Sequence, residues 1–347
     1  MSAQRFDNLT TRWACRLSRR RLIATSMAVG TTLTVRPPAF AQPVATPATD
    51  DFAGLVDIGG RSLYLECRGS GGPIVILEAG YRSPVDVWTT DIVSPDTPRT
   101  MVFAGVAANT RTCVYERPGV AAVIDGTFSP SRSDPAPMPR TVADAVADLH
   151  TLLEVAGLPG PYVLVGHSFG GLVVRLYAST YPDDIAGIVL VDALSEYVRS
   201  ELTPEEWVAY AAVVSAVPPD LAAYADLETM DMDASFDQMT QASEGQPLAG
   251  IPLTVISAGL PFGIPQADLG FPPDRLQEAW SASQDQLAAL VPDTAHIVAT
   301  ESAHYVQLDQ PDLVTEAIRQ VVVAVRDQGI WSTERAAAGT DTGGAGS

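Results

Sequence analysis

The stretch VLVGHSFGGL, residues 163–172, restricts the fold more than any other part of the sequence. An apolar, strand-like run leads into it, and Ser168 stands between Gly166 and Gly170, where a helical pattern begins. Glycine permits sharp turns and close backbone approach, so this spacing predicts a tight turn from a strand into a helix. Such a turn strains the serine backbone and exposes its hydroxyl. The alternative is an ordinary strand-to-helix turn with no chemical role.

Strands and helices alternate on both sides of this turn. Apolar runs of strand length occupy residues 54–58, 61–67, 73–80, 111–116, 162–166, 187–193, 252–259 and 295–300. Helical patterns lie between or after them, at 141–157, 170–182 and 311–325. The central runs are apolar at nearly every position, which is typical of strands covered on both faces. The sequence therefore predicts one doubly wound, mostly parallel α/β sheet.

Residues 194–250 interrupt this alternation. The segment has helical character and is longer than a simple crossover, so we interpret it as a helical cap inserted between core segments 54–193 and 251–330. It holds eleven acidic residues and a single arginine, Arg199. It is either a lid that selects substrates by charge or a solvated acidic surface. After the core, the composition of residues 331–347 predicts a disordered tail.

The charged residues exclude several classes of function. The chain has no lysine, and its 21 arginines face 41 acidic residues for a net charge of −20. Without lysine there is no Walker-type phosphate loop, no pyridoxal Schiff base and no Ser-x-x-Lys site. An acidic chain without a basic stripe is also not expected to bind nucleic acid.

The N-terminus has the pattern of an export signal. Arg19 and Arg20 precede a short apolar run at 22–35, and Ala41 ends a small-x-small sequence. The run is too short to span a bilayer. The sequence predicts a twin-arginine signal peptide at 1–41, then a linker at 42–53. It therefore predicts a periplasmic, cell-wall or extracellular location with no membrane span after cleavage; an uncleaved anchor or a disordered basic tail is the alternative.

Ser168 needs a base, because a serine hydroxyl at its ordinary pKa is a weak nucleophile. The four histidines are His150, His167, His296 and His304. His304 follows the last predicted strand and precedes the final helix, so it lies at the carboxyl edge of the sheet. The sequence therefore predicts His304 as the base for Ser168.

Four segments together resemble the α/β-hydrolase superfamily, specifically its bacterial serine hydrolases. They are TRTCVYERPG, the stretch from ADLHTLLEV through the serine turn, GIVLVDA and SAHYVQLDQPDLVTEAI. The resemblance covers about residues 54–326. It implies an eight-stranded sheet with the cap after the sixth strand, and a serine–histidine–acid triad.

The acid of the triad departs from the commonest layout of the superfamily. That layout places it just after the seventh strand, but here the strand ends at Gly259 and no carboxylate follows until Asp268. A less common layout takes the acid from the end of the sixth strand, which is Asp192 here. We favour Asp192 and keep Asp268 as the alternative. A carboxylate that only caps a helix or ties a loop would also suit the position of Asp192.

The oxyanion of an acyl-transfer reaction requires backbone N–H donors. The residue after the nucleophile, Phe169, supplies one. The resemblance places the second at Tyr81 in EAGYRSP, where Ala79 and Gly80 replace the more familiar His-Gly pair.

Two cysteines remain after removal of the signal, Cys67 and Cys113, in an oxidising compartment. In the strand order of the superfamily, the strands that carry them are neighbours. The resemblance thus predicts a disulfide between them, and two buried thiols are the alternative.

No cofactor or metal site is predicted. The acidic stretch at 231–237 lacks the glycine and distal glutamate of a calcium loop, and GSGG at 69–72 runs into a strand rather than a helix. We expect a serine hydrolase that cleaves a carboxylic ester, lactone or thioester of a small molecule through an acyl-enzyme on Ser168. The alternatives are acyl transfer or perhydrolysis, as in cofactor-free haloperoxidases, a carbon–carbon bond hydrolase or lyase, and a non-catalytic binding protein. The sequence does not indicate an oligomeric state.

Overall fold

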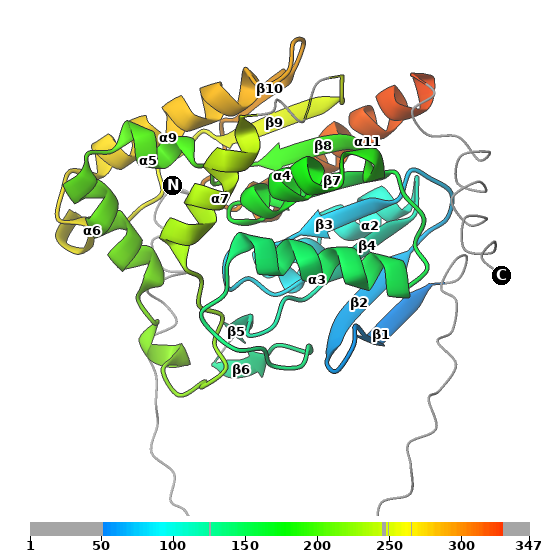
Figure 1. Cartoon of the computed structure of the whole chain (residues 1–347), viewed down its shortest axis with the longest axis horizontal. Helices are drawn as coiled ribbons and strands as arrows, with labels where there is room; N and C mark the ends of the chain where they lie inside the picture. Colours follow the sequence, from blue (N-terminus) through cyan, green and yellow to red (C-terminus); the bar gives the residue numbers. More distant parts are fainter. Residues whose placement is uncertain (1–50, 125, 245–247, 249, 265, 329–347) are drawn as a thin grey trace, which may run out of the picture.

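Figure 1 shows the computed structural model of the chain, a layered arrangement of helices around one central sheet. The structure describes residues 51–328 except 125, 245–247, 249 and 265. The predicted signal peptide at 1–41 and the predicted tail at 331–347 lie outside the described residues, as does nearly all of the predicted linker.

The central sheet has eight strands in the order β1-β2-β4-β3-β7-β8-β9-β10 within the described residues. The strands are β1 (Phe52–Asp57), β2 (Ser62–Arg68), β3 (Val75–Glu78), β4 (Thr112–Tyr115), β7 (Tyr162–His167), β8 (Ile185–Val191), β9 (Leu253–Ala258) and β10 (Ala295–Ala299). β2 is antiparallel to β1 and β4, and the other pairs are parallel. The predicted mostly parallel, eight-stranded sheet is confirmed.

Helices connect these strands and cover both faces of the sheet. The longer ones are α3 (Val142–Val155), α4 (Gly170–Thr180), α6 (Pro204–Ser215), α7 (Met232–Ser243), α9 (Pro273–Ala288) and α11 (Pro311–Asp327). The shorter ones are α1 (Asp86–Thr89), α2 (Val102–Ala107), η2 (Pro182–Asp184), α5 (Tyr197–Glu201), η3 (Pro219–Leu221), α8 (Gln266–Leu269) and α10 (Val306–Asp309). Among the described residues, no helix is long and apolar enough to cross a membrane.

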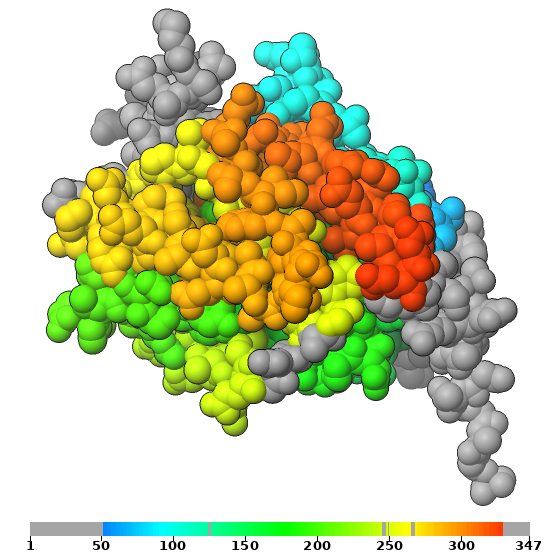
Figure 2. All heavy atoms as spheres, turned by 90° about the horizontal axis from the view of Figure 1, so that it is seen from above, coloured from blue at the N-terminus to red at the C-terminus, as the bar shows by residue number. Residues whose placement is uncertain are grey.

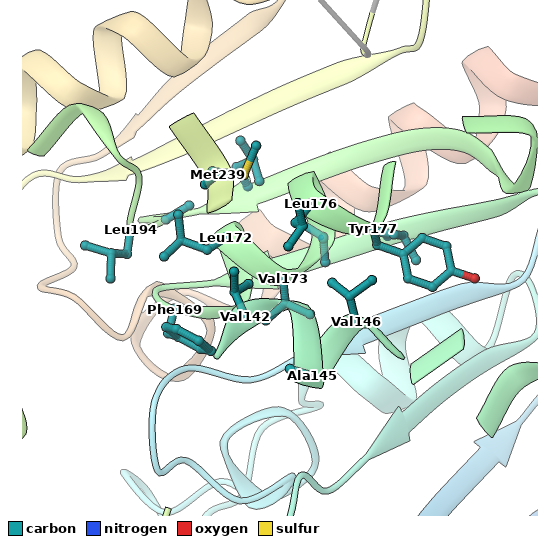
Figure 3. Close-up of a cluster of buried hydrophobic side chains, with 14 of the residues drawn as sticks. Val142, Ala145, Val146, Phe169, Leu172, Val173, Leu176, Tyr177, Leu194 and Met239 are labelled. Atoms are coloured by element: carbon teal, nitrogen blue, oxygen red, sulfur yellow. The ribbon is translucent and has the colours of Figure 1, made fainter. Parts of the chain in front are cut away.

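Alternate residues of the central strands enter two separate cores. Leu164 of β7 and Leu190 of β8 pack with α3, α4 and α9. Val163, Val165 and Val189 point to the opposite face and pack with α2 and α11. Because strand side chains alternate between faces, apolar runs without interruption can fill both cores. Figure 3 shows the first core, where side chains of α3, α4 and α7 meet.

The sequence patterns do not predict α9 or a short hairpin. Helix α9, in the yellow-orange part of Figure 2, packs against α5, β9 and β10. The hairpin consists of β5 (Ala121–Ile124) and β6 (Thr127–Pro130), and it packs by Ala121 against Leu221 and Leu227 of the cap.

The segment between β8 and β9 carries α5, α6, η3 and α7, which Figure 1 shows grouped at one end of the sheet. Two of its acidic side chains are buried rather than solvated. Glu196 pairs with Arg175 of α4, and Glu228 pairs with Arg117 after β4. Part of the acidic character of the cap therefore serves contact with the core.

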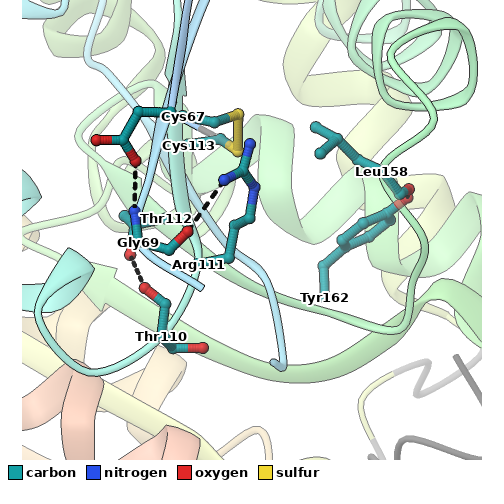
Figure 4. The surroundings of a disulfide bond; sticks show 9 residues. Cys67, Gly69, Thr110, Arg111, Thr112, Cys113, Leu158 and Tyr162 are labelled. Carbon is teal, nitrogen blue, oxygen red and sulfur yellow. Dashed lines mark hydrogen bonds between the residues drawn. A yellow bond between two sulfur atoms is a disulfide. The ribbon is translucent and has the colours of Figure 1, made fainter. Parts of the chain in front are cut away.

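Cys67 of β2 and Cys113 of β4 form a disulfide (Figure 4). The antiparallel register places the two residues directly opposite each other, and both are fully buried. The bond joins the second and third strands of the sheet, counted from the edge strand β1.

Candidate active site

Ser168 stands in a strained turn between β7 and α4. Its φ of 51° lies in the left-handed region, where backbone strain in a residue other than glycine costs about 1–3 kcal/mol of stability. The neighbouring glycines are required by contact. A Cβ on Gly166 would lie 2.5 Å from the Gly170 carbonyl oxygen, and one on Gly170 would lie 2.7 Å from the Glu78 carbonyl oxygen. The turn is therefore a strained strand-to-helix turn rather than an ordinary one.

Asp192 follows β8, also with a left-handed φ, of 40°. Its side chain is buried and accepts three hydrogen bonds. His304 Nδ1 lies 2.7 Å from Oδ2, while Trp280 Nε1 and the Ala258 N–H each lie 3.0 Å from Oδ1. A buried carboxylate needs such donors to replace water. The same bonds fix the direction in which the carboxylate faces the imidazole.

His304 lies in the loop between β10 and α10, and its side chain is 18% exposed. Because Nδ1 contacts Asp192, Nε2 is left to act on a neighbouring hydroxyl. The ring packs against Phe262 at 4.9 Å and Trp280 at 5.5 Å between centroids. Within the described residues, Ser168 Oγ makes no hydrogen bond; the bond between nucleophile and base often forms only when substrate is bound.

His167 connects the serine turn to the His304 loop. Its Nε2 lies 2.9 Å from the carbonyl oxygen of His304, and the two rings are 4.8 Å apart. Burial lowers the pKa of His167 well below its usual value, so the ring is neutral and donates from Nε2. His167 therefore joins two loops rather than serving as the base.

Asp268, the alternative acid, is exposed on α8. The structure brings Asp192, and not Asp268, to His304.

The two proposed oxyanion donors belong to residues close to Ser168. Phe169 directly follows it at the start of α4, whose N-terminus favours negative charge. Tyr81 follows Gly80, and a Cβ on Gly80 would lie 3.1 Å from Ser168 Cβ. Among the described residues, neither the Phe169 N–H nor the Tyr81 N–H finds an acceptor. Both donors are therefore available to an anion formed beside Ser168.

A second serine–histidine contact lies away from this turn. Ser257 Oγ of β9 is 2.6 Å from His296 Nε2, and His296 Nδ1 is 3.6 Å from Asp285. However, Ser257 lies within a strand that has neighbours on both sides, so it has neither a strained turn nor a helix N-terminus beside it. The remaining histidine, His150, stacks on Tyr181 with 3.7 Å between centroids.

Sequence reasoning missed Trp280 and Phe262 as neighbours of the imidazole. The apolar spacing of 273–288 could have indicated α9. Nothing local to Trp280 indicates that its indole reaches Asp192, 88 positions away.

The family described as alpha/beta hydrolase fold matches residues 75–240. This range begins at β3, includes the serine turn and ends in α7. The chain has the α/β-hydrolase fold. Two solved structures have the same fold. The chain aligns to the haloalkane dehalogenase DatA of Agrobacterium tumefaciens with a TM-score of 0.54 and 16% identity, over 80% of this chain and 97% of that one. For a bromoperoxidase of Bacillus anthracis the TM-score is 0.51, with 17% identity over 78% and 100%.

Relatives by sequence extend the comparison. The chain is 25% identical to YqjL of Bacillus subtilis over 262 residues, 75% of this chain and 88% of the relative. It is 38% identical to a pimeloyl-[acyl-carrier protein] methyl ester esterase of Chromobacterium violaceum over 107 residues, 30% of this chain and 36% of the esterase. Relatives from Hormonema carpetanum and Schizosaccharomyces pombe are matched over 21% and 26% of their length. The comparisons support a hydrolase of the α/β fold.

Proposed function

We propose that the protein is a serine hydrolase that cleaves a carboxylic ester, lactone or thioester through an acyl-enzyme on Ser168. The observation that carries this proposal is the 2.7 Å contact between His304 Nδ1 and Asp192 Oδ2 at the sheet edge where Ser168 stands. A buried acid, an oriented imidazole and a strained serine are the parts that acyl transfer needs. The esterase of Chromobacterium violaceum supports an ester as the substrate.

In the first half of the reaction, His304 Nε2 takes the proton of Ser168 as Oγ attacks the acyl carbonyl carbon. The carbonyl oxygen becomes an anion, which the N–H groups of Phe169 and Tyr81 bind. Loss of one such donor typically costs about 10²–10³ in kcat. His304 then gives its proton to the leaving alcohol or thiol, and the acyl group remains on Ser168.

In the second half, water loses a proton to His304 Nε2 and attacks the acyl-enzyme. The same oxyanion donors act again, and the proton returns to Ser168 Oγ as the acid leaves. Asp192 holds the imidazole in the tautomer with Nδ1–H and stabilises the imidazolium formed in both halves. Its own orientation depends on Trp280 and Ala258.

Hydrolysis is tested with p-nitrophenyl esters of short to long acyl chains, comparing the protein with Ser168→Ala. We expect turnover that falls by about 10³-fold or more in the variant, as for loss of a triad member. Addition of an alcohol or of hydrogen peroxide tests acyl transfer and perhydrolysis. If the new ester or the peracid accumulates faster than the carboxylic acid, acyl transfer replaces hydrolysis as the function.

We also propose that the protein is exported through the twin-arginine signal at 1–41. The Cys67–Cys113 disulfide supports an oxidising destination. Arg19→Lys combined with Arg20→Lys should retain the protein in the cytoplasm of a bacterial host. Cell fractionation measures this, and equal export of the variant would contradict the proposal.

A further inference from the structure

A buried carboxylate of the cap reaches the loop that carries the second oxyanion donor. Glu228 lies between η3 and α7, and its side chain is 2% exposed. It accepts the backbone N–H of Arg82 at 2.5 Å and Arg117 Nε at 2.6 Å. Arg82 follows Tyr81, the proposed donor. The cap is therefore bonded directly to the residue beside the oxyanion site.

Arg117 fixes the peptide group that contains the donor. Its Nη2 lies 2.7 Å from the Gly80 carbonyl oxygen, which also accepts the Ser83 N–H at 3.1 Å. The Gly80 carbonyl and the Tyr81 N–H belong to one planar, trans peptide, so they point in opposite directions. Because Arg117 holds the carbonyl on one side, the N–H is directed to the other side.

Glu228 fixes the next peptide. Arg82 has a left-handed φ of 58°, a conformation that persists only where its surroundings hold it. Its N–H bonds to the Glu228 carboxylate, and its Nε lies 3.0 Å from the Glu228 carbonyl oxygen. Its guanidinium also reaches the carbonyl oxygens of Ala216 at 2.7 Å and Ser215 at 3.2 Å. All these contacts of Arg82 are with the cap.

The charges of this cluster are paired away from water. Arg117 is 3% exposed and lies between Glu228 and Glu78, which are 2% and 1% exposed. Arg117 also donates to the Ala79 carbonyl at 2.8 Å. Hydrogen bonds of a buried charge to a backbone are strong and directional. The loop from Ala79 to Arg82 is thus held by one core cation and one cap anion.

We propose that Glu228 is a positioning residue that, with Arg117, orients the Tyr81 N–H toward the oxyanion, so that the oxyanion site is complete only with the cap in place. This rests on the proposed serine hydrolase function. Glu228 touches no reacting atom and acts through the two peptides that flank Tyr81.

The test uses Glu228→Gln in the full chain, with turnover of a p-nitrophenyl ester counted per active site titrated by a fluorophosphonate. We expect kcat to fall by about 10- to 100-fold, less than for outright loss of an oxyanion donor, with KM within about threefold. The affinity for an alkylboronic acid, which forms a tetrahedral adduct on the serine, should fall in parallel. The pH profile of kcat/KM should keep its acid limb, because the His304–Asp192 contact is unchanged.

Glu196→Gln is the matched control. Glu196 also belongs to a buried ion pair between cap and core, with Arg175, but it does not contact the loop from Ala79 to Arg82. A loss of stability shared by both variants measures the cost of breaking such a pair. In this control, unlike in Glu228→Gln, turnover per titrated site should stay within about threefold of that of the parent protein.

The outcomes separate the two proposals. If the unaltered protein neither hydrolyses esters nor reacts with the fluorophosphonate, the proposed function fails. If the unaltered protein is active, the role of Glu228 is tested by comparing the two variants. Equal turnover and equal boronic acid affinity in Glu228→Gln and Glu196→Gln overturn that role. If Glu228→Gln does not fold, the variant Arg82→Ala tests the inference instead. Its substitution removes the contacts of the half-exposed Arg82 side chain with the cap, and it should lower kcat by several-fold at constant KM. An unchanged kcat overturns the inference.

Discussion

His304 Nδ1 and Asp192 Oδ2 lie 2.7 Å apart although 112 positions separate the two residues in the chain. Asp192 follows β8 and His304 lies in the loop after β10. The contact exists because these parallel strands end at the same edge of the sheet. Asp192 has a left-handed φ at this edge, as Ser168 does at the end of β7. Strain of this kind persists only where the surrounding packing holds it, and its presence at both residues agrees with the catalytic roles proposed for Ser168 and Asp192.

Asp192→Asn should lower kcat by about 10³–10⁴, because an amide cannot hold the Nδ1–H tautomer or stabilise the imidazolium. The measurement is kcat for ester hydrolysis by the variant, after near-ultraviolet circular dichroism has verified that the variant is folded. Asp268→Asn is the control and should leave kcat within twofold, since Asp268 is exposed on α8. The reverse order of effects would assign the acid to Asp268.

Trp280→Phe should lower kcat by about tenfold while the ring contact with His304 is kept. The substitution removes one hydrogen bond to the buried carboxylate of Asp192, a type of bond worth about 1.5–3 kcal/mol. Steady-state kinetics measure the change. Trp207→Phe is matched, because it removes an indole hydrogen bond to Asp233 in the cap. Equal effects of the two substitutions would refute a specific role for Trp280.

The fold was largely predictable from the sequence because the strands are nearly continuous apolar runs. β7 and β8 are buried at every position, and only a sheet covered on both faces suits such runs. By contrast, α9 and the β5–β6 hairpin were missed. The hairpin is short, and the outer strand β6 is exposed throughout.

The site was predictable where chemistry depends on local pattern and not where it depends on tertiary contact. The glycines around Ser168 and the absence of a carboxylate directly after Gly259 are readable in the sequence. The contacts of Trp280 with Asp192 and of Glu228 with Arg82 join distant segments. No local pattern marks either residue, because the partners are 88 and 146 positions away in the chain.

Asp309→Asn should stabilise the fold at neutral pH. Burial raises the pKa of Asp309 to about 6, against the opposing effects of the Ala303 N–H and Arg99. When the pKa of a carboxyl is higher in the folded chain than in the unfolded chain, the fold becomes less stable as pH rises from about 4 to about 6. Asparagine keeps an oxygen for the Ala303 N–H but does not ionise.

The expected gain in the free energy of unfolding is about 1 kcal/mol near pH 7, since solvent at this half-exposed position weakens the effect. Near pH 4 the gain should vanish. Urea unfolding at the two pH values measures it. A gain that is equal at both, or larger at the lower pH, would show that Asp309 does not titrate in this way.

Replacement of Cys67 and Cys113 by alanine should lower the free energy of unfolding by about 2–4 kcal/mol, because the bond closes a loop with a sequence separation of 46. Thermal unfolding with and without a reducing agent measures the effect. The reductant should lower the Tm of the parent protein and leave that of the double variant unchanged. Two reactive thiols in the denatured, non-reduced protein would contradict the disulfide.

The nucleophile is the central claim, and covalent labelling tests it most directly. The folded protein is treated with a fluorophosphonate and the modified peptide is identified by mass spectrometry, beside Ser168→Ala and Ser257→Ala. Ser257 is the informative control because it too contacts a histidine, His296. Our account predicts one label per chain, on Ser168, that disappears in Ser168→Ala and persists in Ser257→Ala. A label on Ser257, or no label on folded protein, would contradict it.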